Sequence, residues 1–117
     1  MSYVDGFVMA VPTASREAFI AHAGKFDPMF KECGALRVIE CWADDVPHGQ
    51  VTDFFRAVQA REDESVVFSW VEWPDKATRD AGMKKLMESD AMDPATNPPP
   101  FDGKRMIFGG FAPVLEL

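Results

Sequence analysis

The chain has 117 residues, and its 12 Lys and Arg against 19 Asp and Glu give a formal net charge of −7. This length suits a single domain with its own core, which we expect over residues 1–117. The acidic balance argues against a nucleic-acid backbone or an anionic membrane surface as the partner.

The two cysteines, Cys33 and Cys41, are too few for a disulfide framework and are typical of a reducing compartment. No stretch reaches the roughly 18 unbroken apolar residues of a spanning helix. We therefore predict a cytoplasmic protein that does not enter a membrane.

The first third of the chain predicts a strand followed by a helix. Residues 3–11 are almost continuously apolar, which is typical of a central strand covered on both faces. Ser15 is a good N-cap, and one apolar stripe follows at helical spacing: Phe19, Ala23, Phe26 and Phe30. At Pro28 the helix either kinks or restarts, and it ends at Gly34.

Two further strands are predicted in the middle of the chain. In residues 36–43, one strand face carries Leu36, Val38, Glu40 and Trp42. Residues 52–60 fit a short helix and an extended segment equally well. Residues 66–73 alternate as a strand, which Pro74 ends.

The last third predicts a helix, a loop and a strand. Asp75 caps the second helix, which runs to about Glu88. Residues 90–104 contain Pro94 and Pro98–Pro100 and form a loop. Residues 105–115 form the last strand, where the pair Gly109-Gly110 indicates a bulge or a close backbone approach.

This order of elements predicts an α+β fold, a ferredoxin-like antiparallel sheet with two helices on one face. Two helices cover only one face, yet the strands carry large apolar groups on both, such as Trp70 and Val71. The simplest cover for the second face is an identical sheet. We therefore predict a homodimer whose sheets pack face to face.

Several motifs resemble the YbaA-like family of bacterial proteins. They include Tyr3-Val4-Asp5-Gly6-Phe7, Trp42-Ala43-Asp44-Asp45-Val46-Pro47, Val66-Val67-Phe68-Ser69-Trp70 and Pro100-Phe101-Asp102-Gly103-Lys104-Arg105-Met106-Ile107. The resemblance covers residues 3 to about 111. It implies a domain of unknown function in the dimeric α+β barrel superfamily, and an extended conformation for residues 52–60. It implies no reaction.

Two carboxylates are candidates for a general base. Glu40 shares a strand face with Trp42, and burial against indole rings would raise the pKa of such a carboxyl group. Asp5 lies between apolar neighbours in the first strand, where an unpaired charge would be costly. Each has a structural alternative: Glu40 at an edge or paired with Arg37 or Arg105, and Asp5 bonded to neighbouring backbone or capping a turn.

The acidic loop Asp44-Asp45-x-x-His48, with Asp53 beyond it, has oxygen and imidazole ligands but no known metal signature. We interpret it as a turn and predict neither a metal nor a cofactor. The cations Arg37, Arg79, Lys104 and Arg105 either bind a small anion or pair with surplus carboxylates.

Two functions remain open. The first is a cofactor-independent enzyme, or a binder, for a small hydrophobic or aromatic molecule inside the barrel. Trp42 and Trp70 would be its walls, Asp5 or Glu40 its base, Arg37 and Arg105 further substrate contacts, and residues 90–104 its lid. The second is a non-catalytic homodimeric structural or interaction module, because no complete catalytic set is present.

Overall fold

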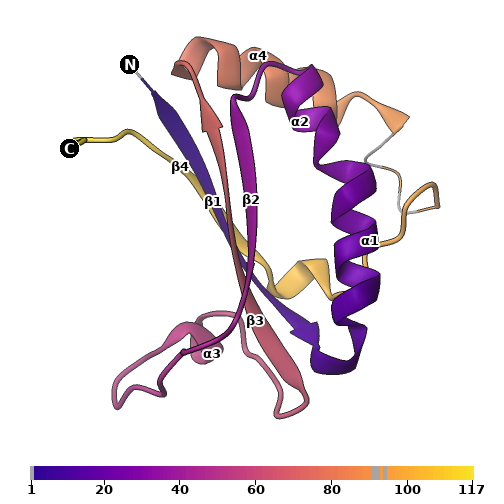
Figure 1. Ribbon diagram of the computed structural model, residues 1–117, viewed down its shortest axis with the longest axis vertical. Coiled ribbons are helices and arrows are strands. Elements are labelled where there is room, and N and C mark those ends of the chain that lie inside the picture. Colours follow the sequence, from indigo (N-terminus) through magenta and orange to yellow (C-terminus); the bar gives the residue numbers. More distant parts are fainter. Residues whose placement is uncertain (1, 91–92, 94) are drawn as a thin grey trace.

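One antiparallel sheet carries most of the helices on a single side. The computed structural model describes residues 2–90, 93 and 95–117. The strand order is β2-β3-β1-β4, with β1 (Tyr3–Pro12), β2 (Arg37–Trp42), β3 (Glu64–Trp73) and β4 (Ile107–Phe111). Figure 1 shows α1 (Arg16–Phe26), α2 (Pro28–Glu32) and α4 (Lys76–Met87) on one side of this sheet. The predicted ferredoxin-like fold is confirmed.

The first predicted helix restarts at Pro28 rather than continuing through a kink. After the turn η1 (Thr13–Ser15), α1 ends at Phe26 and α2 begins at Pro28, because proline has no N–H for the ladder. Gly34 follows with a φ of +114°, and a Cβ there would lie 2.7 Å from Cγ2 of Thr78. Both the left-handed backbone and the close approach require glycine at this turn.

Residues 54–57 form a one-turn helix, α3 (Phe54–Ala57), so the extended conformation implied by the family resemblance is wrong there. The reason is local, since the Asp53 side chain accepts a hydrogen bond from the Arg56 N–H at 2.8 Å. Figure 1 shows α3 on the side of the sheet opposite the other helices. There Val58 packs against Val8 and Val66.

The final strand is shorter than predicted, because β4 ends at Phe111. Its ladder with β1 is regular through the paired glycines, since Gly109 lies opposite Gly6 and Gly110 opposite Asp5. The predicted bulge is therefore absent from this ladder. Side chains rather than backbone approach Gly110, where an added Cβ would meet the Tyr3 hydroxyl and the Arg79 guanidinium.

The core on the helical side consists of two clusters of buried residues. One contains Met9, Val11, Phe19, Ala23 and Val67, and the other contains Phe30, Ala35, Val71, Trp73 and Leu86. The register places one row of the sheet, Phe7, Ser69 and Glu40, between these clusters. No helix in the described part of the chain is long and apolar enough to cross a bilayer.

Candidate functional site

Glu40 of β2 projects from the helical side of the sheet. Its register partner on β3 is Ser69, which is buried and donates a hydrogen bond from Oγ to Oε2 of Glu40. Trp42 lies on the same face, and its ring centroid is 6.0 Å from that of Phe19 on α1. The structure therefore brings together Glu40 and Trp42, as the alternation of β2 predicted.

Asp27 is the residue that the sequence did not indicate as part of this site. It occupies the N-cap position of α2, but its side chain makes no capping hydrogen bond. Instead it is hydrogen-bonded to Glu40. Burial, this hydrogen bond and the charge of Glu40 raise the pKa of Asp27 to about 8. At neutral pH Asp27 is thus a protonated acid that faces a second carboxyl group.

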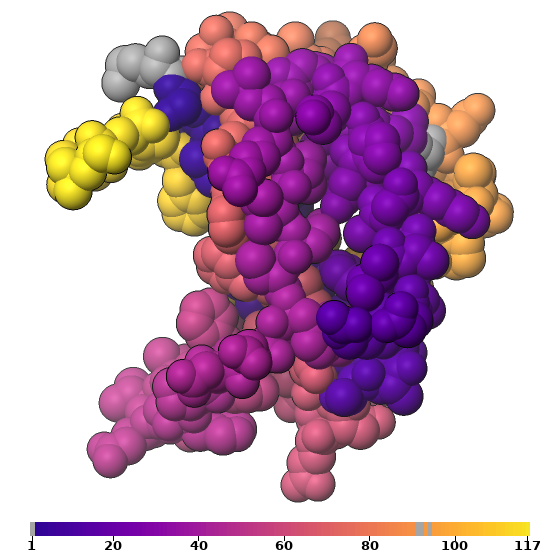
Figure 2. Space-filling model, in the orientation of Figure 1, coloured from indigo at the N-terminus to yellow at the C-terminus, as the bar shows by residue number. Residues whose placement is uncertain are grey.

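Aromatic rings lie on the same side of the sheet as this carboxyl pair. Phe26, next to Asp27, has its ring centroid 5.6 Å from that of Phe30, which in turn is 6.4 Å from that of Phe7. Phe7 packs against both core clusters. Figure 2 shows the surface hollowed between β2 and α1, the two elements that flank the pair. The acid and its partner therefore lie on the side of the sheet that carries the apolar core, beside this hollow.

Asp5 has a full set of partners instead of a free oxygen. Arg79 of α4 donates to it from Nη2 at 2.7 Å and from Nε at 3.0 Å, and the Trp73 indole donates at 2.9 Å. Only 3% of Asp5 is exposed. A buried carboxylate with this many donors has its charge compensated, and it joins α4 to the sheet.

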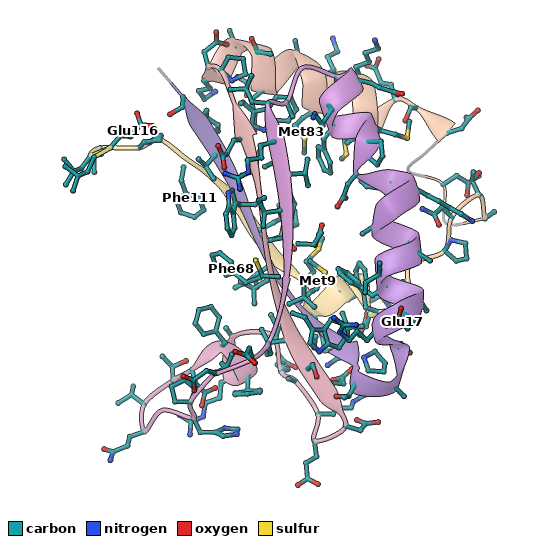
Figure 3. All side chains as sticks on the ribbon, in the orientation of Figure 1. Met9, Glu17, Phe68, Met83, Phe111 and Glu116 are labelled. Atoms are coloured by element: carbon teal, nitrogen blue, oxygen red, sulfur yellow. The ribbon has the colours of Figure 1, made fainter. Side chains whose placement is uncertain are left out.

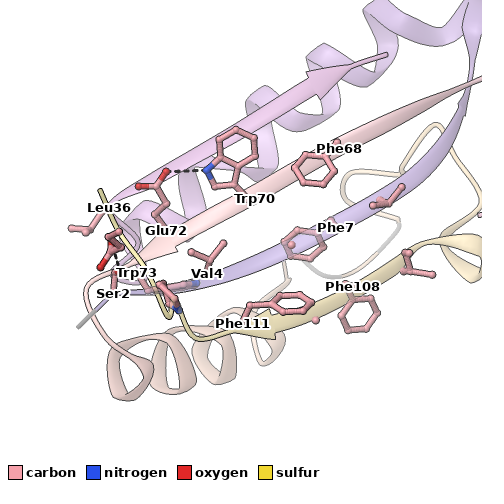
Figure 4. A pocket seen from close by; sticks show the side chains of 16 residues that line it. Ser2, Val4, Phe7, Leu36, Phe68, Trp70, Glu72, Trp73, Phe108 and Phe111 are labelled. Atoms are coloured by element: carbon pink, nitrogen blue, oxygen red, sulfur yellow. Dashed lines mark hydrogen bonds between the residues drawn. The ribbon is translucent and has the colours of Figure 1, made fainter. Parts of the chain in front are cut away.

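Trp70 lies on the other face of the sheet from Trp42. Trp42 is the register partner of Val67, three residues from Trp70 along β3, and an odd step along a strand changes face. The prediction that these two indoles form the walls of one pocket is therefore wrong. The Trp70 indole donates a hydrogen bond to Glu72 at 2.9 Å on its own side (Figure 4).

The face that carries Trp70 holds a shallow apolar pocket of about 790 Å³. We call this the open face; its lining includes Val4, Gly6, Leu36, Phe68, Trp70 and Phe111. Figure 3 shows Phe68 and Phe111 on the side of the sheet opposite Met9. Phe68 is 43% exposed and Phe111 is 63% exposed. A contiguous apolar surface of this kind is typical of an interaction site.

The two arginines predicted to contact substrate lie far apart along β3. Arg105 forms two 2.7 Å hydrogen bonds with Glu64 at the beginning of β3, which lower the pKa of Glu64 to about 2. Arg37 is the register partner of Glu72 near the other end, with 3.9 Å between the charged atoms. Arg105 pairs with a carboxylate, as the alternative interpretation held, and the two cations do not share an anion site.

The acidic loop uses its most buried carboxylate for backbone bonds. Asp53 accepts from the N–H groups of Arg56 at 2.8 Å and Gly49 at 3.0 Å, while His48 Nδ1 stays 3.8 Å away. Asp44 and Asp45 are exposed. Among the described residues there is no group of three or more metal-ligating side chains.

Part of the predicted lid packs on α1. Residues 91, 92 and 94 lie outside the described residues. Asn97 donates to the carbonyl oxygen of His22 at 3.3 Å, and the Phe101 ring lies 6.2 Å from Phe19 and 6.0 Å from His22. Within the described residues, Nδ1 of His22 is buried without a hydrogen-bond partner.

A solved structure has the same architecture. It is a dimeric ferredoxin-like protein from an uncultured marine organism, with a TM-score of 0.64 over 99% of this chain and 98% of that chain. The sequence identity is 14%, so the likeness concerns the fold alone.

Closer relatives cover almost the whole sequence. The uncharacterized protein YbaA of Escherichia coli (strain K12) is 54% identical over 116 residues, which are 99% of this chain and 99% of that protein. The YbaA protein of Shigella flexneri is 54% identical over the same length. The family model described as "Protein of unknown function (DUF1428)" matches residues 2–103. The chain therefore belongs to the DUF1428 family.

Proposed function

We propose that the chain is a cofactor-independent enzyme that moves protons on a small apolar or aromatic molecule bound beside Asp27 and Glu40. The observation that carries this proposal is the hydrogen-bonded pair of carboxyl groups, with Ser69 donating to Glu40. Two neighbouring carboxyl groups, one of which has a raised pKa, are a common acid–base arrangement in enzymes. The apolar surroundings favour a guest with a ring or an alkyl group.

The chemistry that suits this pair is tautomerisation of a carbonyl compound. Protonated Asp27 would donate its proton to the carbonyl oxygen, while Glu40 would accept a proton from the adjacent carbon. The guest then leaves as its enol, with no change in its total number of protons. Because the two groups are hydrogen-bonded in the free protein, the proton returns from Glu40 to Asp27 and restores the starting state. Trp42, on the same strand face, would pack against the ring of the guest.

The test uses a panel of small aryl ketones as probes. A ketone present at 100 times its Kd should stabilise the protein by about 2.7 kcal/mol in a thermal-shift assay. NMR in D2O should then show faster exchange of the protons next to its carbonyl group. Glu40→Gln should abolish this acceleration and Asp27→Asn should reduce it.

The matched control is Glu17→Gln, a change at an exposed glutamate on α1, which should leave the exchange rate unchanged. An exchange rate in Glu40→Gln equal to that of the unmodified protein would remove Glu40 as the base. A panel in which no ketone raises the melting temperature or exchanges faster would contradict the proposal as a whole.

The open face supports a second proposal, a homodimer with sheets packed face to face. Its exposed apolar side chains would be covered by the same surface of a second copy, which the twofold symmetry of homodimers makes self-complementary. The solved ferredoxin-like neighbour is described as dimeric. Light scattering should therefore give the mass of two 13.0 kDa chains. A homodimer without any ketone effect would favour the non-catalytic interaction module.

The cytoplasm is the compartment that we propose for this dimer. Cys33 and Cys41 are both free and do not form a disulfide. Free, partly buried thiols persist in a reducing compartment. Labelling of both thiols in freshly lysed cells, without prior reduction, would agree with this placement.

A further inference from the structure

An apolar segment follows β4 and leaves the sheet. After β4, residues 112–117 form what we call the C-terminal tail, and it extends away on the side opposite α1 and α2 (Figures 1 and 3). Val114 is 98% exposed and Leu115 is 73% exposed. Glu116 accepts a 3.1 Å hydrogen bond from Ser2 and lines the open-face pocket together with Pro113. The tail thus stands beside the open face with its apolar side chains uncovered.

One row of the sheet connects the tail to the opposite edge. Across this row the register partners are Arg37 on β2, Glu72 on β3, Val4 on β1 and Phe111 on β4. The tail therefore begins at one end of the row, and Arg37 stands at the other. The Arg37 side chain is 63% exposed, and its 3.9 Å contact with Glu72 leaves the guanidinium free to bond elsewhere. Leu36, beside it, is 59% exposed.

Twofold symmetry brings these two ends together. We take the twofold axis of the dimer to run parallel to the strands, between the two sheets. Rotation about this axis leaves the height of each row along the strands unchanged, but it exchanges the positions of the two edges of the sheet. The β2 edge of one copy then faces the β4 edge of the other, and these two edge strands run antiparallel, as closure of a barrel requires. The tail of one copy therefore meets Leu36 and Arg37 of the partner subunit.

We infer that the C-terminal tail of each copy packs over Leu36 of the partner subunit, with Glu116 bound by Arg37 of the partner subunit. This inference rests on the homodimer proposed above. Opposite charges face each other in this arrangement, and both exposed apolar surfaces become covered. Arg105 is the less suitable cation, because Glu64, Asp102 and the Gln59 carbonyl oxygen already hold it.

Disulfide trapping between separately tagged chains tests the contact. In a Cys33→Ser, Cys41→Ser background, Arg37→Cys protein is mixed with Glu116→Cys protein and oxidised. We expect a cross-linked heterodimer in the mixture and none with either protein alone. The matched alternative pairs Lys104→Cys with Glu116→Cys, since an axis across the strands would bring the tail toward Lys104. Cross-linking of that pair instead would overturn the inference.

Light scattering on the same proteins separates this inference from the one it rests on. A dimer without the Arg37–Glu116 cross-link would sink the tail contact and leave the homodimer standing, whereas a monomer would remove both. Truncation after Pro113 should raise the dimer Kd by about tenfold or more, because apolar burial is lost. An unchanged Kd in the truncated chain would also contradict the tail contact.

Discussion

Asp27 and Glu40 are hydrogen-bonded across the boundary between the α1–α2 junction and β2. Because the Asp27 side chain bonds to Glu40, it does not cap α2, and the first turn of that helix has no side-chain cap. Giving up a cap costs about 1 kcal/mol in comparable helices. Local rules that a protein breaks at one position often mark a functional site.

The first prediction concerns stability against pH. The pKa of Asp27 is raised to about 8 in the folded chain and is near 3.9 when unfolded. Between these values only the folded state binds the proton. The contribution of Asp27 to the free energy of unfolding is therefore fully present below about pH 4. As the pH rises from 4 to 8, this contribution falls by at most about 1.4 kcal/mol per pH unit. Asp27→Asn should remove this slope and raise the melting temperature at pH 8 but not at pH 4, as measured by thermal unfolding.

Asp75 is the matched control, because it caps α4 through the Thr78 N–H and its pKa is lowered. Its contribution has the opposite sign, since it is present above the unfolded pKa and is lost as the pH falls. Asp75→Asn should therefore reduce stability at pH 8 more than at low pH. Parallel pH profiles for the two variants would show that Asp27 does not hold its proton.

The second prediction is that Asp5→Asn destabilises the fold by about 3 kcal/mol. The change removes the buried charged partner of the Arg79 guanidinium, and only the more exposed Asp80 carboxylate, 3.0 Å from Nη1, still pairs with it. Urea unfolding measures the loss. The exposed ion pair of Arg16 and Glu17 is the comparison, and Glu17→Gln should cost less than about 1 kcal/mol. Equal costs for the two variants would contradict a structural role for Asp5.

The third prediction compares two glycines in helices. A Cβ at Gly82 of α4 would lie 2.5 Å from the Cys33 carbonyl oxygen and 2.7 Å from the Trp73 ring, so Gly82→Ala should destabilise by about 1–3 kcal/mol. At Gly24 of α1 nothing lies within 4 Å, so Gly24→Ala should stabilise by up to about 1 kcal/mol. Unfolding curves of both variants check the opposite signs. A stabilised Gly82→Ala would mean that α4 packs less closely than described.

The fourth prediction concerns the proposed dimer. Trp70→Glu places a charge in the middle of the open face and should convert the dimer to a monomer, as measured by light scattering. The control is Ile20→Glu on α1, where an apolar side chain is 48% exposed outside the open face. That variant should remain dimeric. If both variants behave alike, the open face is not the interface.

Much of the fold follows from patterns within short segments. Pro74 ends β3, and Asp75 begins α4 through a 2.7 Å bond to the Thr78 N–H, as predicted. Pro28 marks the beginning of α2 for a local reason too. The first turn of a helix has no intrahelical partner for its N–H groups, so proline loses no hydrogen bond there. The alternation of β2 correctly placed Glu40 and Trp42 on one face. Each of these outcomes depends on residues a few positions apart.

The candidate site depended on contacts between distant segments. Alternation gives every strand two faces but does not say which faces of β2 and β3 coincide, so Trp42 and Trp70 were wrongly assigned to one pocket. The residues next to Asp27 predict a helix cap at this position. Its actual partner is Glu40 on β2, thirteen positions further along the chain. Likewise Arg79 compensates Asp5 from α4.

Hydrophobic periodicity, caps and prolines act over a few residues, so they were enough to predict the order of strands and helices and the excess of apolar strand surface. Which carboxyl group has a cationic partner and which has a second carboxyl group beside it follows from contacts between distant segments. The charge of Asp5 is balanced by Arg79, and the acid of Asp27 is held by a second carboxyl group. The proton affinity of a buried group depends on the charges and donors within a few ångströms, and folding brings these from any point in the chain.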